Sequence, residues 1–189
     1  MAQSDNSLVT GRISGTLNKE LVYREWEGKT VVAKAPRKRK GDPNAKQVET
    51  QEKFLLASRY AKAIIRSTDK SMEEAYAAVL RRRQNVYSRA LEDFLNPPKV
   101  KSINTRNYKG IVGNKFVVRA IDDFRVVSVQ VEIYAANGTL LEEGKAEQDP
   151  FGLDWIYTAT QPNGTLAGTK ITAIATDVPG NEGILDVSL

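Results

Sequence analysis

The residues best suited to chemistry in this sequence are clustered cations. Arg37, Lys38, Arg39 and Lys40 follow one another directly after a proline, and residues 81–83 form a second run of three arginines. Consecutive helical residues point about 100° apart, so the second run forms no single patch, whereas the first lies in a predicted loop. Such runs bind acidic proteins or nucleic-acid phosphates, or they simply remain solvated. All three interpretations stay open at this point.

Two aromatic residues precede the basic loop in a predicted hairpin. Tyr23 and Trp26 can stack on bases, although packing of the hairpin explains them equally well. We expect the partner to be the acidic protein surface of a larger assembly, with nucleic acid as the alternative and with no membrane or small-molecule substrate. The candidate partner-binding residues are Tyr23, Trp26, Arg37, Lys38, Arg39 and Lys40.

Several kinds of catalysis lack their residues in this chain. The sequence contains no His and no Cys, which removes thiol nucleophiles, thiolate zinc sites, disulfides and Ser-His triads together. Gly28-Lys-Thr30 has the end of a phosphate-binding loop, but Tyr23 occupies the position where that loop needs glycine. We therefore predict a protein that is not an enzyme and has no cofactor.

A group of acidic residues offers one further site. Asp122, Asp123, Asp177 and Asn181 lie at predicted strand ends, where oxygen ligands can hold Ca²⁺. Asp and Asn at such positions more often cap turns with their side chains. Turn capping is the preferred interpretation, with a calcium site as the alternative.

The chain changes character at Pro97-Pro98. Residues 1–99 carry 20 Lys/Arg and 12 Asp/Glu, a net charge of +8, whereas residues 100–189 carry 8 and 11, a net charge of −3. Helical periodicity gives way to short β-branched runs at the same point. We predict a basic N-terminal docking domain over residues 1–98 and a second domain over residues 99–189.

The N-terminal domain is predicted to combine strands and helices. Alternating residues and the Glu27-Gly28 turn predict a β-hairpin over residues 17–35. Asp42-Pro43 is a typical helix start, and apolar stripes predict helices over residues 43–66 and 71–96, the second opened by a Ser-x-x-Glu capping box. Because the connecting loop is short, we expect an antiparallel αα-hairpin.

The C-terminal domain is predicted to be all-β. Apolar residues alternate with polar ones in runs such as residues 115–121 and 127–133, and Asn137-Gly138 is a strong hairpin turn. About seven strands result, the usual number for an immunoglobulin-sized sandwich. The overall fold class is therefore α+β.

The same region resembles bacterial immunoglobulin-like domains. The resemblance rests on residues 173–181, Ala-Ile-Ala-Thr-Asp-Val-Pro-Gly-Asn, and on the pairing of residues 120–123 with 129–133. It implies a disulfide-free sandwich with Trp155 in the core and a binding or spacing role, but no activity.

The N-terminal half resembles an uncharacterised family of small bacterial proteins with no assigned activity. Those proteins have glycine-spaced residues, a Trp-x-Gly hairpin, a basic segment containing proline and a Gln-rich helix. The corresponding residues are Gly11, Gly15, Trp26, Gly28, Pro36 and the run Gln47-Val-Glu-Thr-Gln51.

Together these features predict a non-enzymatic structural, adaptor or cargo component of a bacterial phage-tail-like particle, either a contractile injection system or a phage. The first residues lack the basic and apolar regions of a signal peptide, so we expect cytoplasmic synthesis, and the particle then carries the protein out of the cell. Two alternatives remain: a nucleic-acid-associated protein, and an injected effector with carboxylate-based hydrolase activity.

Overall fold

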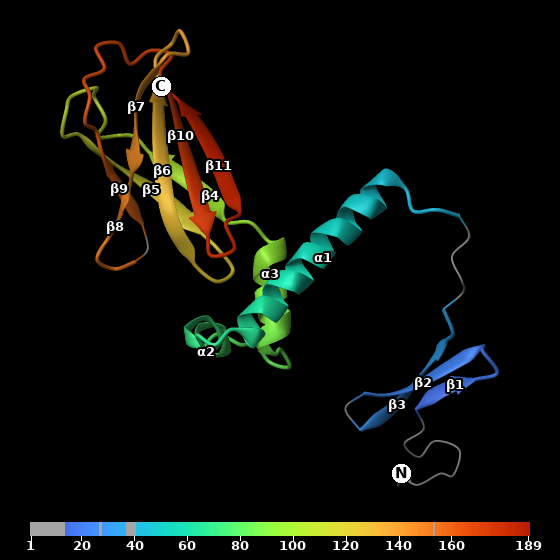
Figure 1. Cartoon of the computed structure of the whole chain (residues 1–189). Helices are drawn as coiled ribbons and strands as arrows, with labels where there is room; N and C mark the ends of the chain where they lie inside the picture. Colours follow the sequence, from blue (N-terminus) through green and yellow to red (C-terminus); the bar gives the residue numbers. More distant parts are fainter. Residues whose placement is uncertain (1–13, 27, 37–40, 153) are drawn as a thin grey trace, which may run out of the picture. The chain divides into compact units, whose positions relative to one another are not determined.

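The chain forms two compact units in the computed structural model, which describes residues 14–26, 28–36, 41–152 and 154–189 (Figure 1). The first unit spans Met1–Asn44 and the second Ala45–Leu189. The fold is mixed, with three helices and three antiparallel sheets among the described residues. The predicted boundary at Pro97-Pro98 differs from this division, because the helices pack with the C-terminal sheets and lie in the same unit.

The N-terminal unit is a three-stranded antiparallel sheet of order β1-β2-β3. The hairpin predicted over residues 17–35 is shorter in the structure and comprises β2 and β3, because Leu17 belongs to β1 and a turn with positive φ at Asn18 and Lys19 follows it. Gly28 lies between β2 and β3 with a φ of +73°, which glycine adopts without strain. A preceding strand was not predicted, since three residues are too few for a recognisable alternation. The strands are β1 (Gly15–Leu17), β2 (Leu21–Trp26) and β3 (Lys29–Lys34).

The helical layer contains α1 (Ala45–Arg66), α2 (Ser71–Ala77) and α3 (Val86–Leu95). The prediction of one continuous helix over residues 71–96 is wrong. Arg83 has a φ of +67°, outside the helical region, and Asn85 starts a new helix. The Asn85 side chain accepts from the Ser88 backbone N–H at 2.8 Å, and the Ser88 hydroxyl accepts from the Asn85 backbone N–H at 3.0 Å. This capping box favours the start of a separate helix, α3, over the continuation of α2.

The predicted helix starts also need correction. The first helix begins at Ala45 rather than at residue 43. Ser71 is the first residue of α2 rather than its cap, because Lys70 occupies the N-cap position without a side-chain capping bond. Asp69 performs the capping role instead, since its Oδ1 accepts from the Ser71 backbone N–H at 2.9 Å.

Two four-stranded antiparallel sheets follow the helices. One sheet has the order β11-β10-β6-β7 and the other β4-β5-β9-β8, which makes eight described strands where about seven were predicted. The strands are β4 (Lys99–Asn104), β5 (Lys115–Ile121), β6 (Val126–Tyr134), β7 (Leu140–Lys145), β8 (Glu147–Gln148), β9 (Trp155–Thr158), β10 (Lys170–Asp177) and β11 (Glu182–Ser188).

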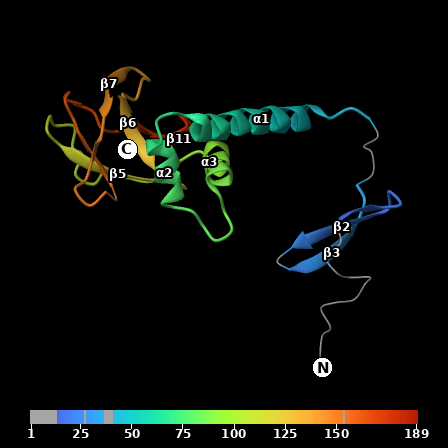
Figure 2. The same cartoon turned by 60° about the horizontal axis from the view of Figure 1, so that its bottom comes forward.

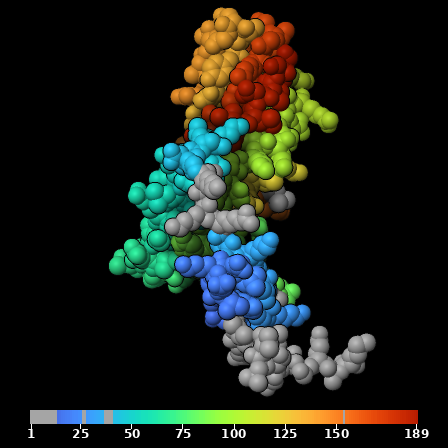
Figure 3. Space-filling model, turned by 90° about the vertical axis from the view of Figure 1, so that its right-hand side faces the viewer, coloured from blue at the N-terminus to red at the C-terminus, as the bar shows by residue number. Residues whose placement is uncertain are grey.

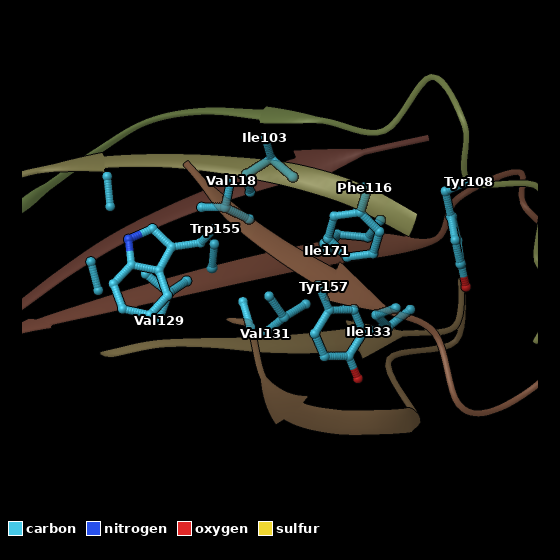
Figure 4. Close-up of a cluster of buried hydrophobic side chains, with 14 of the residues drawn as sticks. Ile103, Tyr108, Phe116, Val118, Val129, Val131, Ile133, Trp155, Tyr157 and Ile171 are labelled. Atoms are coloured by element: carbon cyan, nitrogen blue, oxygen red, sulfur yellow. The ribbon is translucent and has the colours of Figure 1, made fainter. Parts of the chain in front are cut away.

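Both sheets contribute to one hydrophobic core (Figure 4). Every second residue of β5 is buried, as its alternating sequence predicts, and so are residues 129, 131 and 133 of β6. Val127, on the same predicted face of β6, is instead 53 % exposed. Trp155 is 7 % exposed and belongs to this core, the location expected for it. The buried members include Phe116, Val118, Val129, Val131, Ile133, Trp155, Tyr157 and Ile171.

The helices lie together at one end of the two sheets (Figures 1 and 2). Tyr76 of α2 stacks on Phe124 of the β5–β6 loop, with ring centroids 4.3 Å apart. Asn181, in the turn before β11, donates from Nδ2 to the Phe94 carbonyl at 3.1 Å. These contacts join elements far apart in sequence, so the Pro97-Pro98 segment connects two layers of one unit.

Gly183 of β11 gives a direct test of this junction. A Cβ at this position would lie 1.9 Å from the Pro98 carbonyl oxygen, whereas Gly164 has open space around it. We expect Gly183→Ala to lower the free energy of unfolding by about 2–3 kcal/mol, because backbone must move to relieve the overlap. Chemical denaturation measures the loss, and Gly164→Ala serves as the matched control. Equal stability of the two variants would contradict the close approach.

Candidate partner-binding site

The described residues of the N-terminal sheet include apolar side chains but form no buried core. None of its described residues is buried, and Leu17, Val31 and Val32 are 57 %, 39 % and 50 % exposed. Val31 and Val32 are adjacent in β3, so they point to opposite faces of the sheet. Small isolated sheets need packing against another element to be stable. Both faces therefore offer contact surface to a partner.

The predicted site residues are distributed around this sheet. Tyr23 is half-buried in β2, opposite Gly15 of β1 and Val32 of β3. Trp26 ends β2 opposite Lys29, and its side chain is not among those described. The four basic residues Arg37, Lys38, Arg39 and Lys40 lie outside the described residues.

The first half of α1 adds a second uncovered surface. The buried residues of this helix are Ala57, Ala61 and Ile64, all in its second half. Phe54 and Leu55 are each 51 % exposed. A shallow cavity of about 340 Å³ lies beside Phe54 and is bordered by Lys46, Lys53 and Leu95. This part of the helix therefore combines apolar and cationic contact groups.

A buried polar cluster lies where the helices meet the sheets. Asp93 of α3 is fully buried, and its Oδ2 accepts from the Tyr76 hydroxyl at 2.6 Å. The oxygens of Tyr76 and Tyr60 are 2.9 Å apart, and because the Tyr76 proton points to Asp93, Tyr60 is the donor. A chain of hydrogen bonds thus runs from α1 through α2 to α3.

Burial dominates the electrostatics of this cluster. Burial raises the pKa of Asp93 to about 7. The charges of Asp122 and Asp177 also raise this pKa, whereas the Tyr76 hydrogen bond and the charge of Arg89 lower it. Burial and the hydrogen bond to Asp93 also hold the pKa of the Tyr76 hydroxyl well above its usual value. Asp93 therefore gains or loses its proton near neutral pH.

Arg89 connects the helices to the sheets through the same region. Its side chain is 2 % exposed, and its guanidinium donates to Glu92 Oε2 at 3.0 Å and to the Asp123 carbonyl. Asn96 strengthens this link by donating to Asp123 Oδ2 at 2.9 Å. These groups serve the folded structure rather than an exposed site.

Two of the acidic residues considered for calcium, Asp122 and Asp177, cap turns, whereas the Asp123 side chain contacts Arg81 and Asn96. Asp122 Oδ2 accepts from the backbone N–H groups of Phe124 and Arg125, each at 2.9 Å. Asp177 accepts from the Asn181 backbone at 2.6 Å and from its side chain at 2.8 Å. Among the described residues, no group of three acidic side chains is arranged to hold a metal ion. The contacts of Asp122 and Asp177 agree with turn capping, the interpretation preferred from the sequence.

Two buried carboxylates, Asp93 and Glu142, were not predicted from the sequence. Asp93 follows Arg89 by four residues, a spacing that usually marks an exposed helical charge pair, so it gave no signal of burial. Glu142 Oε2 accepts from the Thr160 backbone and hydroxyl, each at 2.7 Å, and thereby fixes the loop after β9.

Comparison with known proteins identifies no relative that assigns a function. No known family profile matches the chain, and no curated protein matches it. One solved structure, of an engineered protein, is 23% identical with a TM-score of 0.30 over 49% of this chain. The chain spans only 18% of that protein's length. Within the described residues, no helix has the length and apolar character needed to cross a membrane.

Proposed function

We propose that this protein is a non-enzymatic assembly component whose basic N-terminal region docks on an acidic protein surface. The observation that carries the proposal is the N-terminal sheet, whose described residues include exposed apolar side chains and no buried ones. The net charge of +4 over residues 1–44, from 9 Lys/Arg and 5 Asp/Glu, favours an acidic partner, because complementary charge steers and orients protein association.

In this proposal the C-terminal sheets form an immunoglobulin-like sandwich that presents or spaces the docking region. Two antiparallel four-stranded sheets around a shared core support the assignment. A binding role also agrees with the use of Asp93 and Glu142, which hold tyrosine hydroxyls and a loop inside the fold. The setting we propose is a bacterial phage-tail-like particle, a contractile injection system or a phage.

A pull-down from the native host tests the docking step. The full chain is expected to retain an acidic protein in moderate salt, and replacing all four of Arg37, Lys38, Arg39 and Lys40 by Gln is expected to weaken retention at least about tenfold. The matched control replaces four exposed cations of the second half by Gln: Lys101, Arg106, Lys109 and Lys115. Both variants change the net charge equally, so location alone distinguishes them.

The outcomes separate the proposed functions. Equal retention by both variants would contradict docking through the basic loop. Retention of DNA or RNA with a steep salt dependence, and of no acidic protein, would favour the nucleic-acid alternative. Particles purified from the host are expected to contain the chain by mass spectrometry, and its absence from them would contradict the proposed setting.

A further inference from the structure

The outer face of the sheet β11-β10-β6-β7 contains a groove of about 510 Å³. Its floor is aliphatic, because Ile174 of β10 and Ile184 of β11 are register partners and Ile184 is 60 % exposed. Tyr134 and Lys170, also register partners, line the groove further along the strands. The C-terminal strands, drawn in red, are exposed on the side of the molecule shown in Figure 3.

Carboxylates cross this face in a single row. Glu143 of β7 is directly opposite Glu132 of β6. Thr172 of β10 lies between Glu132 and Asp186 of β11, and it is a register partner of both. Like charges directly opposite each other destabilise a sheet, so the Glu132–Glu143 pair has an energetic cost in the free protein. A cationic partner on this face would remove that cost.

The groove contains little positive charge of its own. Lys170 Nζ lies 2.8 Å from Asp186 Oδ2, and Thr172 donates to Asp186 Oδ1 at 2.8 Å. The Tyr134 hydroxyl donates to Glu132 Oε2 at 2.7 Å. In the described part of the chain, neither Glu132 nor Glu143 forms an ion pair. Asp186 is thus already neutralised, whereas Glu132, which lines the groove, and its register partner Glu143, which lies beside the groove, are available to an incoming cation.

These groups match the chemistry of Lys and Arg side chains. Carboxylates accept charge-assisted hydrogen bonds from guanidinium and ammonium groups, and the ring of Tyr134 offers a face for a cation. The aliphatic floor of Ile174 and Ile184 suits the methylene stems that Lys and Arg bury while their charges stay at the rim. A cationic chain segment fits this groove better than a neutral or acidic one.

We propose that this groove binds the basic N-terminal region of a second copy of the chain. This inference rests on the proposed function and names its acidic partner. Charge complementarity supports a second copy, since residues 1–44 carry 9 Lys/Arg and 5 Asp/Glu, a net charge of +4, whereas the row across this face consists of carboxylates. Docking one surface on a different surface of the next copy is a heterologous contact, which produces rings or open filaments rather than closed dimers.

Sedimentation velocity of the full chain over a range of concentrations tests the inference. At low ionic strength we expect species larger than dimers, and these should dissociate as salt screens the charges. Replacing Glu132 and Glu143 together by Gln should weaken association about tenfold or more. The control replaces Glu147 and Glu182 by Gln, because both are exposed, lie outside the row formed by Glu143, Glu132 and Asp186, and give the same change in charge. Equal melting temperatures establish that each variant is folded.

A charge-swap experiment identifies the two surfaces as partners. One variant has Glu132→Lys and Glu143→Lys, and another has Arg37, Lys38, Arg39 and Lys40 all replaced by Glu. Each variant alone should associate at least about tenfold more weakly than the natural chain. Mixing them should restore association, because the reversed loop then meets the reversed groove.

Three outcomes would overturn the inference: a chain that is monomeric at every concentration at low salt, association unaffected by the groove substitutions, and mixed variants that do not recover. If the chain stays monomeric yet retains an acidic host protein through its basic loop, the proposed function stands and only the identity of the partner changes. If the basic-loop variant loses neither self-association nor host-protein retention, both proposals fail.

Discussion

Raising the pH from about 5 to about 8 is expected to lower the free energy of unfolding by about 2–3 kcal/mol through Asp93 alone. Burial raises the folded-state pKa of this carboxyl to about 7, whereas the unfolded-state value is about 3.9. The folded chain therefore keeps a proton that the unfolded chain has already released. Stability is highest below the unfolded-state pKa and is lost as the pH rises through 7. The full effect is about 4 kcal/mol.

The groups that face Asp93 determine the size of this effect. Tyr76 and Arg89 favour the ionised carboxylate, while Asp122 and Asp177 oppose it. Once Asp93 is ionised, its charge is held at the interface between the helices and the sheets with one oxygen, Oδ1, lacking a hydrogen-bond partner in the described structure. A buried charge without full pairing is costly, so the helical layer should be the first part to loosen at high pH.

Urea denaturation at several pH values checks this prediction. Asp93→Asn should remove most of the slope between about pH 5 and pH 8, because the amide does not titrate. A smaller slope should remain from Asp177, whose pKa burial also raises. Asp154→Asn is the matched control, since Arg119 lowers the pKa of that carboxyl and it titrates below this range. An unchanged slope in Asp93→Asn would assign the proton to another group.

The sequence was most informative where one periodicity ran uninterrupted. Alternation placed the buried residues of β5 and of the second half of β6 correctly, although Val127 is exposed. The position of Trp155 in the core was expected from the resemblance to immunoglobulin-like domains rather than from periodicity. These strands follow from local pattern alone, because a half-buried strand must alternate. The pairing order β11-β10-β6-β7 could not be obtained in this way, since it depends on contacts between distant segments.

The helical region shows how an apolar pattern can mislead. Val79 and Leu80 continue the stripe expected for one long helix, yet they are 43 % and 38 % exposed in the segment between α2 and α3. The cap at Asn85 was the competing local signal, and it outweighs the stripe. Likewise, Pro97-Pro98 marks a real change in composition but not a boundary between units, because the Tyr76–Phe124 contact crosses it.

The candidate site was only partly accessible to prediction. Net charge can be counted without a structure, but its change near residue 99 does not coincide with the division between the two units after Asn44. The row formed by Glu143, Glu132 and Asp186 needs strand register, which brings residues from three strands to one line. The raised pKa of Asp93 depends on the burial of its side chain in the folded chain. Chemistry that depends on neighbours across the sheets was therefore invisible in the linear pattern.

Phe116→Ala is expected to lower the free energy of unfolding by about 3–5 kcal/mol. Phe116 is 1 % exposed, and its ring lies between Tyr108 and Tyr157, with centroids 5.7 Å and 5.2 Å away. Truncation removes both aromatic contacts and leaves a cavity that strands of two sheets cannot easily close. Thermal and urea denaturation should agree on the loss.

Phe151→Ala is the matched control, because the same truncation at a side chain that is 86 % exposed should change stability by no more than about 0.5 kcal/mol. Phe116→Leu should lose less than Phe116→Ala, since leucine fills part of the cavity. A loss below about 1 kcal/mol in Phe116→Ala would contradict a shared, well-packed core. The groove on the outer face depends on that core, because the inward residues of β6 and β10 hold its outward residues in register. At temperatures where the variant is partly unfolded, self-association should therefore fall together with the folded fraction.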